Sequence, residues 1–222
     1  MRLPIGCSSL DSLLGKGLES GIITEFFGEG GSGKTNICLQ LTKNVAMKGK
    51  KTIYIDTEGV SVKRLKQISG EDSEKVMENT LFYKPHTFQE QEKSIKEGCR
   101  LAIKENKDFN LLIVDGFTTF YRPLYNSNEE EKMSSRLGRL LLELMKVARK
   151  KDIPVVITTQ VYESDDGKKP VGGHVLYHSA KTIVLLEVLS SNMRRAVIEK
   201  HRSKAKGKNA RFKISQTGLV TP

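Results

Sequence analysis

The sequence predicts an α/β fold in which a mostly parallel central sheet is flanked by helices and extended by antiparallel strands toward the carboxyl end. Three observations predict it. A glycine-rich loop at residues 28–35 lies between an apolar run and a segment with helical spacing. Strand-like and helix-like segments then alternate as far as Thr159, which is typical of parallel sheets. From Thr182 onward, short strand-like segments follow one another and are expected to be antiparallel additions.

The first elements surround the glycine-rich loop. Residues 21–27 (GIITEFF) form the apolar run that leads into it, and this run is expected to be a strand. Ile37, Leu41 and Val45 have the spacing of a helix that follows the loop. Residues 51–56 (KTIYID) are expected to form a second strand. The loop is therefore expected to join a strand to a helix.

The middle of the chain continues the alternation. Residues 87–90 (TFQE) form a capping box, and Ile95 and Cys99 lie on one face of the helix that it predicts. Residues 111–115 (LLIVD) and 153–159 are apolar runs typical of strands buried on both faces. An amphipathic helix for core packing is expected between them, with the apolar face Leu137, Leu140, Leu141, Leu144, Val147 and Ala148.

The last third of the chain has a different pattern. Residues 161–173 contain two aspartates, several glycines and two lysines, a composition that predicts a mobile loop. Helical segments are expected to cease after this loop. Short strands joined by turns are expected at residues 182–189, 195–200 and 211–214.

Composition limits the class of protein. The chain has 222 residues, 37% of them hydrophobic and 28% charged, which predicts one sizeable domain over residues 1–222. No run approaches the ~20 apolar residues of a membrane helix, and the first residues lack a signal peptide, so a cytoplasmic protein with no membrane partner is expected. Cys7, Cys38 and Cys99 are expected to be reduced core thiols. A net charge of +11 fits a polyanionic partner such as DNA or RNA.

The glycine-rich loop satisfies the pattern G-x-x-x-x-G-K-[ST] between a strand and a helix, which predicts a site for ATP and Mg²⁺. Glycines let the backbone N–H groups form a nest around phosphates, and the following helix presents its positive end to them. Lys34 can reach the β and γ phosphates, and the Thr35 hydroxyl can ligate Mg²⁺. The predicted ATP-binding residues of the loop are Gly28, Glu29, Gly30, Gly31, Ser32, Gly33, Lys34 and Thr35.

Three polar residues follow the ends of predicted strands. Asp115 is placed to hold the Mg²⁺ shell, although an acid at a strand end is also a common turn former or helix cap. Glu58 would lie beside the γ-phosphate and could activate the attacking water, or it is a solvated loop acid. Gln160 could sense the γ-phosphate, with generic loop polarity as the alternative. Together with Lys34, Glu58 and Gln160 are the predicted catalytic residues.

Several separated motifs resemble the RecA-type recombinase family, in the same order and through about residue 190. They are the segments at residues 5–15 (IGCSSLDSLLG), 23–29 (ITEFFGE), 54–59 (YIDTEG), 156–161 (VITTQV), 172–174 (GGH) and 178–180 (HSA). The resemblance implies a RecA-like P-loop ATPase core. Within the family the chain is similar to the short archaeal paralogues of the RadA recombinase, a similarity that includes residues 200–203 (KHRS). A single core domain is therefore expected, without an N-terminal helical DNA-binding domain.

The resemblance also implies roles for individual residues. Glu58 stands where the family has its water-activating glutamate, Asp115 matches the acid on the metal side, and Gln160 matches the γ-phosphate sensor. Arg64 matches an arginine that packs on adenine. The first DNA-binding loop of the family falls near residues 119–131, where three consecutive glutamates oppose phosphate binding, so strand exchange is not expected.

Basic residues predict contact with DNA in two places. The family's second DNA loop, near residues 162–173, supplies Lys168 and Lys169. Between Arg194 and Lys213 the chain has nine Lys or Arg residues against one acid, a composition that favours sequence-independent binding of single-stranded DNA. A solvated basic face is the alternative. The candidate residues in this basic tail are Lys200, Arg202, Lys204, Lys206 and Lys208.

A second role is also possible for Lys200 and Arg202. In relatives such as KaiC, a Lys-x-Arg motif on a late strand reaches the nucleotide of the neighbouring subunit, where it would stabilise transition-state charge. Two function classes follow. The first is a DNA-binding mediator of homologous recombination and DNA repair at the nucleoid, with a slow or DNA-dependent ATPase and with RadA as partner. The second is a KaiC-like ring-forming regulatory ATPase that acts on protein partners. The resemblance also suggests a Holliday-junction resolvase as a partner, and a homo-oligomer.

Overall fold

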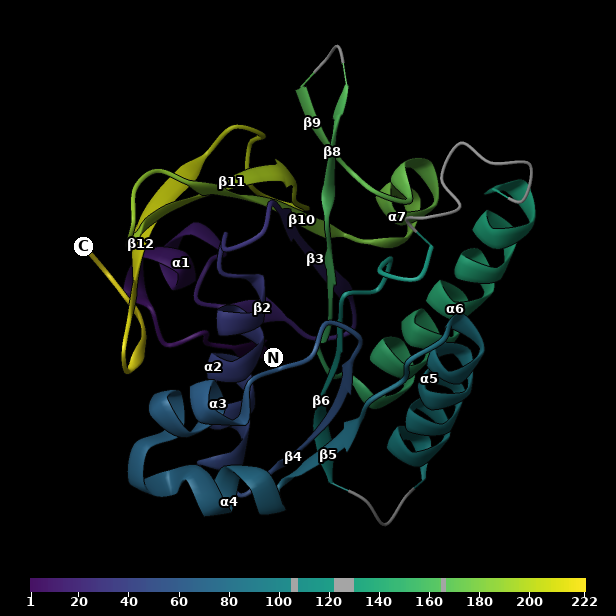
Figure 1. Ribbon diagram of the computed structural model, residues 1–222, viewed down its shortest axis with the longest axis horizontal. Coiled ribbons are helices and arrows are strands. Elements are labelled where there is room, and N and C mark those ends of the chain that lie inside the picture. The colour runs from purple at the N-terminus through teal and green to yellow at the C-terminus, as the bar shows by residue number, and fades with distance from the viewer. Residues whose placement is uncertain (105–107, 122–129, 165–166) are drawn as a thin grey trace.

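The computed structural model describes residues 1–104, 108–121, 130–164 and 167–222 (Figure 1). A nine-stranded sheet runs through the molecule in the order β13-β12-β11-β10-β3-β7-β6-β4-β5. Its central strands are β10 (Thr182–Val188), β3 (Ile23–Gly28), β7 (Val155–Thr159), β6 (Phe109–Asp115), β4 (Lys51–Asp56) and β5 (Thr80–Tyr83). Its remaining strands are β11 (Met193–Lys200), β12 (Asn209–Ser215) and β13 (Gly218–Val220).

The direction of the strands confirms the predicted fold class. From β10 through β3, β7, β6 and β4 to β5, every neighbouring pair is parallel. The pairs β10–β11, β11–β12 and β12–β13 are antiparallel. Because parallel strands end at one edge of a sheet, the segments after β3, β4, β6 and β7 emerge side by side.

Helices cover both faces of the sheet (Figure 1). One face carries α1 (Ser8–Leu13), α2 (Lys34–Ala46), α3 (Val62–Ser69) and α4 (Ser73–Glu78), with the 3₁₀ turn η1 (Gly70–Asp72) between the last two. The other face carries α5 (Phe88–Ile103), α6 (Glu130–Lys151) and α7 (Gly173–Ser179). Two short strands, β1 (Arg2–Leu3) and β2 (Leu18–Glu19), form a separate pair.

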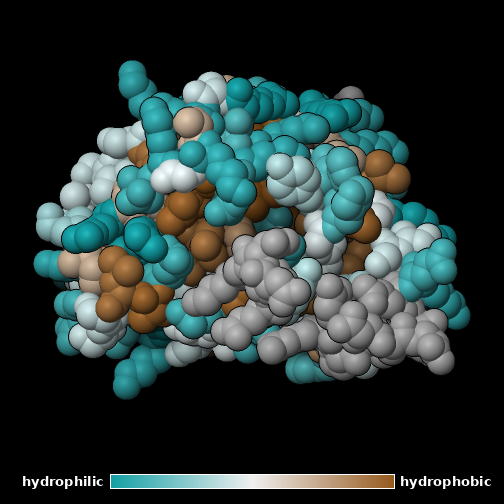
Figure 2. Space-filling model, turned by 90° about the horizontal axis from the view of Figure 1, so that it is seen from above, coloured by the Kyte–Doolittle hydropathy of each residue, from teal (hydrophilic) through white to brown (hydrophobic). Residues whose placement is uncertain are grey.

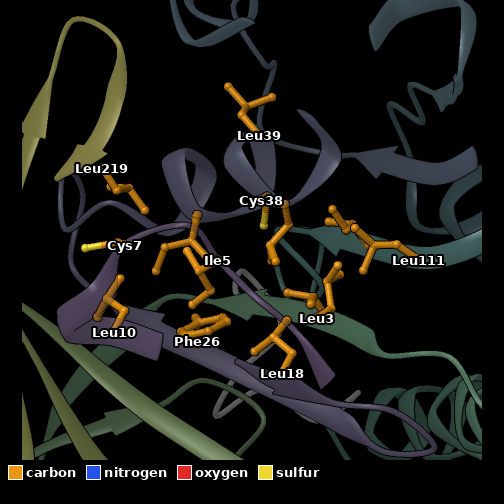
Figure 3. Packing of buried hydrophobic residues seen from close by; sticks show 14 of the residues in the cluster. Leu3, Ile5, Cys7, Leu10, Leu18, Phe26, Cys38, Leu39, Leu111 and Leu219 are labelled. Atoms are coloured by element: carbon orange, nitrogen blue, oxygen red, sulfur yellow. The ribbon is translucent and has the colours of Figure 1, made fainter. Parts of the chain in front are cut away.

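The apolar core on the α2 face holds the loop-bearing strand and helix together. Figure 3 shows Leu10 and Leu18 on either side of Phe26 from β3, with Ile5 and Cys38 above them. Cys38 belongs to α2, so this packing fixes the helix that begins at the phosphate loop. All three cysteines are buried free thiols, which confirms the prediction of reduced core thiols. Within the described residues, no helix has both the length and the apolar character that a membrane span requires.

The prediction for residues 161–173 was wrong. Strands β8 (Val161–Ser164) and β9 (Gly167–Pro170) pair antiparallel as a ribbon that projects from the sheet (Figure 1). Helices also do not cease after it, because α7 follows at once. The segment has the lysine and glycine content of a loop because a ribbon that leaves the sheet needs little apolar surface.

Candidate nucleotide site

The phosphate loop has the backbone geometry that its sequence predicts. It leaves β3 at Gly28 and enters α2 at Lys34, with Gly33 as the N-cap in the left-handed conformation at φ 102°. A Cβ atom at Gly28 would lie 2.3 Å from the carbonyl oxygen of Leu186. Around Gly30 and Gly31, by contrast, a built Cβ meets no atom within 4 Å. The loop is therefore tightly packed at its start and open at its tip.

The polar groups of the loop fit a triphosphate. Lys34 Nζ donates to the carbonyl oxygens of Gly28 at 2.8 Å and Glu29 at 3.0 Å, and burial lowers the pKa of Lys34. The buried Ser32 Oγ has no hydrogen-bond partner among the described residues. An orphaned buried hydroxyl beside an open glycine nest and a buried ammonium fits an anionic ligand. The residues present thus match the phosphates of ATP.

Asp115 ends β6 in a fully buried position. Its carboxylate accepts hydrogen bonds from Tyr54 Oη at 2.7 Å and from Thr158 Oγ1 at 2.6 Å, and it is also hydrogen-bonded to Thr35. Desolvation raises the pKa of Asp115, and these hydrogen bonds oppose the rise. Thr35 and Asp115 therefore form a paired hydroxyl and carboxylate, a donor set of the oxygen type that Mg²⁺ takes alongside substrate phosphates.

Glu58 and Gln160 meet across the end of the sheet. Gln160 Nε2 donates to Glu58 Oε1 at 3.1 Å. The turn that presents Glu58 is fixed by Asp56, whose carboxylate accepts from the backbone N–H groups of Glu58, Gly59 and Val60. The sequence reasoning gave no role to Asp56. Its position at the end of strand β4, directly before the turn, is the signal that could have identified it.

The site is a small cavity of about 130 Å³ that joins the loop to the strand ends. It is lined by Gly30, Gly31, Gly33, Lys34, Thr35, Asn36, Glu58 and Gln160. A larger hollow of about 430 Å³ lies between α5 and α6, among charged side chains such as Glu92 and Arg136. Residues of the phosphate loop line the smaller cavity and not the larger one. The structure thus brings together the predicted loop, Glu58 and Gln160.

Arg64, the predicted adenine contact, lies at the rim of this site on α3. Its guanidinium donates to Asn36 Oδ1 at 2.7 Å and to the carbonyl oxygens of Ser215 at 2.8 Å and Gln216 at 2.9 Å. Asn36 lines the cavity, so Arg64 is one side chain away from the nucleotide site. In this arrangement it ties the first turn of α2 to the end of β12.

The basic tail forms β11, β12 and the turn between them. Three of its candidate residues have specific partners. Lys200 Nζ donates to the backbone carbonyl oxygen of Tyr177 and lies 4.5 Å from the centre of the Tyr177 ring. Arg202 pairs with Glu19 at 2.7 Å, and Lys206 pairs with Glu199 at 2.8 Å. Lys208 is exposed and Lys204 is partly exposed in the same turn.

The predicted DNA loops are described only in part. Residues 122–129 of the first loop and the Lys168 side chain in the second lie outside the described residues. Lys169 is on β9, beside a hollow of about 670 Å³ that Tyr162 and Tyr177 also line. Seen from above, this end of the molecule has hydrophobic surface bordered by hydrophilic side chains (Figure 2). Phe27, which directly precedes the phosphate loop, lines the same hollow as Lys169.

Comparisons with known proteins agree with this architecture. A family model described as Rad51 matches residues 1–222. A relative from Methanococcoides burtonii, named "DNA repair and recombination protein RadB", is 43% identical over 221 residues, covering 98% of this chain and 97% of the relative. A relative of the same name from Archaeoglobus fulgidus is 40% identical over 223 residues, covering 99% and 98%.

A solved structure extends the comparison to three dimensions. It is described as "Crystal structure of the RadB recombinase", is 34% identical in sequence, covers 100% of both chains and has a TM-score of 0.85. The parallel sheet with its antiparallel carboxyl-terminal strands is therefore shared along with the sequence motifs. The chain belongs to the Rad51 family of RecA-like ATPases, in its RadB branch.

Proposed function

We propose that this chain is an ATP-binding protein of DNA repair and homologous recombination, a DNA-binding mediator or regulator of the RadA recombinase that does not itself exchange strands. The observation that carries the proposal is one cavity lined by five residues of the phosphate loop, between Gly30 and Thr35, together with Glu58 and Gln160. The names of its relatives, DNA repair and recombination proteins, support the biological setting. We expect it to work in the cytoplasm at the nucleoid, as one domain.

Each of the site residues has a separate role in the proposed ATPase reaction. The backbone of residues 28–35 and Lys34 hold the triphosphate, and Thr35 with Asp115 would hold Mg²⁺. When bound, Mg²⁺ neutralises charge on the phosphates. Glu58 is the carboxylate placed to orient and deprotonate a water, and Gln160 is hydrogen-bonded to it. Because Gln160 directly precedes β8, it can relay the state of the site to the β8–β9 ribbon.

DNA binding is assigned to the basic tail and the ribbon. Lys204 and Lys208 lie in the turn between β11 and β12, and Lys169 lies on β9. Lysines that contact phosphates give binding that is sequence-independent and falls steeply with salt. The nearly complete lack of aromatic residues in the tail, where Phe212 is buried, argues against strong base stacking there.

Lys200 and Arg202 are too far from their own phosphate loop to act on its nucleotide. Lys200 lies six residues along β11 from Arg194, which contacts the loop, so about 20 Å of strand separates them. Beyond their contacts with Tyr177 and Glu19, the functional roles proposed for these two residues are contact with DNA or with the nucleotide of a neighbouring copy. The neighbour could be a second copy of this chain or RadA, and a Holliday-junction resolvase is a further candidate partner.

The test is ATP turnover by the full chain with and without single-stranded DNA, at about 50 and about 200 mM salt. We expect slow turnover that DNA stimulates, with the stimulation lost at the higher salt concentration. Turnover that rises with protein concentration and ignores DNA would contradict the proposal and favour a KaiC-like ring that acts on protein partners. Replacement of Lys200 or Arg202 then separates the roles: a trans-acting residue changes assembly-dependent turnover and leaves DNA affinity unchanged.

A further inference from the structure

Arg194 is a buried arginine on β11 that contacts the phosphate loop from the far end of the sequence. Its Nε donates to the carbonyl oxygen of Gly31 at 2.8 Å. The whole residue is 8% exposed, and the two residues are separated by 163 positions in the chain. None of the nucleotide-binding roles described above includes this side chain.

The contact falls where the loop is least supported by packing. Around Gly30 and Gly31 a built Cβ meets no atom within 4 Å, whereas Gly33 lies close to Phe212 and Ile214. The hydrogen bond from Arg194 therefore fixes the carbonyl of Gly31 at the open tip of the loop. Because a peptide unit is planar, fixing this carbonyl also fixes the direction of the next N–H group, that of Ser32, which donates to the carbonyl oxygen of Glu29 at 3.2 Å and closes the turn at the loop tip.

Arg194 is itself rigidly held. Its Nη1 donates to the carbonyl oxygen of Ser190 at 2.7 Å, in the turn between β10 and β11, and to that of Met193 at 3.0 Å, at the start of β11. Its backbone pairs with Val188 on one side and Phe212 on the other. The loop tip is thus tied to the antiparallel part of the sheet, which also carries the basic tail.

The charge of Arg194 points toward an anion. All its hydrogen bonds go to backbone carbonyl oxygens, and within the described part of the chain it has no carboxylate partner. A buried cation without an acid is costly unless a counter-charge is supplied. The loop beside it is built for phosphates, and Lys34 and the α2 N-terminus add positive potential there.

We infer that Arg194 is a positioning residue of the nucleotide site, which orders the tip of the phosphate loop and couples it to the β10–β11 turn. This inference rests on the proposed function, since it requires that the loop binds ATP. It adds a control point: movement of the antiparallel strands would change the order of the loop tip, and so the ATP affinity, with the sequence of the loop unchanged.

The experiment compares MgATP affinity and steady-state kinetics of the full chain with those of Arg194→Ala and Arg194→Lys. Loss of a hydrogen bond from a charged donor predicts about tenfold weaker binding for Arg194→Ala. KM is expected to rise by a similar factor while kcat changes less than about twofold, because Glu58 keeps its place. Arg194→Lys keeps the charge but cannot bridge Gly31 and Ser190, so it should restore affinity only in part.

Arg195→Ala is the matched control. Arg195 is the next residue on β11, points to the opposite side of the strand, and pairs with Glu187 at 2.6 Å with 41% of its side chain exposed. This variant should bind MgATP as tightly as the unchanged chain. If Arg194→Ala does not fold, Arg194→Lys decides alone.

Two failures are distinguishable. If the unchanged chain does not bind MgATP, the proposed function is wrong. If the unchanged chain binds and both Arg194 variants bind within about twofold of it, the inference about Arg194 is overturned. Amide hydrogen exchange at residues 29–33 gives a second readout. Exchange is expected to be faster in Arg194→Lys than in the unchanged chain, and unchanged in Arg195→Ala.

Discussion

At the scale of single residues, the nucleotide site depends on polar groups that are buried and already hydrogen-bonded. Asp115 receives bonds from Tyr54 and Thr158, and Asp56 receives three backbone N–H groups. Each carboxylate is therefore held in one orientation before any ligand arrives. In the proposed site, such pre-organisation would hold Glu58 and Thr35 in place before the reaction begins.

A third buried acid, Glu25 on β3, has a different consequence. Thr159 Oγ1 donates to its Oε1 at 2.7 Å, while Oε2 has no partner among the described residues. Desolvation raises the pKa of Glu25 from 4.5 to about 7, and the bond from Thr159 and the charge of Lys200 oppose the rise. In the folded chain Glu25 therefore holds its proton at pH values where the unfolded chain has lost it.

Stability should consequently fall as the pH rises through this interval. The contribution of Glu25 to the free energy of unfolding is fully present below pH 4.5 and is lost as the pH approaches and passes about 7. Glu25→Gln removes the titration, so its stability relative to the unchanged chain should improve by about 2 kcal/mol between pH 5 and pH 8. Urea unfolding of both chains at these pH values measures this difference in the free energy of unfolding. If the free energy of unfolding changes with pH in the same way in both chains, the prediction is wrong.

At the scale of elements, the antiparallel strands support the phosphate loop. Phe212 on β12 is fully buried, and a built Cβ at Gly33 would lie 3.4 Å from its ring. Two hydrogen bonds add to this support: Arg64 donates to the carbonyl oxygen of Ser215 at the end of β12, and Arg194 on β11 donates to that of Gly31 in the loop. The strands that carry the basic tail are therefore part of the nucleotide site's support.

Removal of the Phe212 ring should be severe. Phe212→Ala is expected to lower the free energy of unfolding by about 3–5 kcal/mol, because it leaves a cavity in the core under the loop. The neighbouring Arg211 is exposed, so Arg211→Ala should change the free energy of unfolding by less than about 0.5 kcal/mol. Denaturant unfolding of the two variants compares them. Equal losses would show that β12 does not contribute to the core in this way.

The elements that sequence predicted are those with local signals. The loop of residues 28–35 and the capping box at Thr87 are short motifs, and the structure has both: α2 begins at Lys34, and Thr87 accepts from Glu90 N. The β8–β9 ribbon and α7 were missed because a projecting ribbon and a seven-residue helix have too few apolar positions to show a period.

The missed parts of the site have a common physical cause. Gln160 and Glu58 were predicted individually, since each follows a strand with a strong apolar pattern. The contact between Arg194 and Gly31 could not be predicted, because 163 residues separate them and an arginine on a basic strand resembles a solvent-exposed one. The hydrogen bonds of Arg64 to Ser215 and Gln216 could not be predicted for the same reason, since tertiary folding alone brings these partners to it.

At the scale of the whole molecule, the basic tail is expected to provide the salt-dependent part of DNA affinity. Each lysine that contacts phosphate adds about 0.7 to the slope of log affinity against log salt for single strands. A chain with Lys204, Lys206 and Lys208 replaced by alanine should therefore show a slope reduced by about 2. Fluorescence anisotropy of a labelled oligonucleotide across a salt series measures the slope.

A matched set of basic residues controls for net charge. Lys146, Arg149 and Lys150 are exposed on α6, away from the basic tail. Their replacement removes the same charge, and the slope should change by less than about 0.5 if they do not contact DNA. Equal effects of the two sets would indicate that the overall charge, rather than the tail, sets the affinity.

The central claim is that residues 28–35, Glu58 and Asp115 form an ATPase site in which Glu58 activates water. Single-turnover hydrolysis of MgATP by Glu58→Gln tests it most directly, with MgATP affinity measured in parallel. The account predicts hydrolysis slowed by about 10²-fold or more, with affinity changed by less than about threefold, because the proposed phosphate contacts come from residues 28–35 rather than from Glu58. Hydrolysis at the unchanged rate in Glu58→Gln would contradict it.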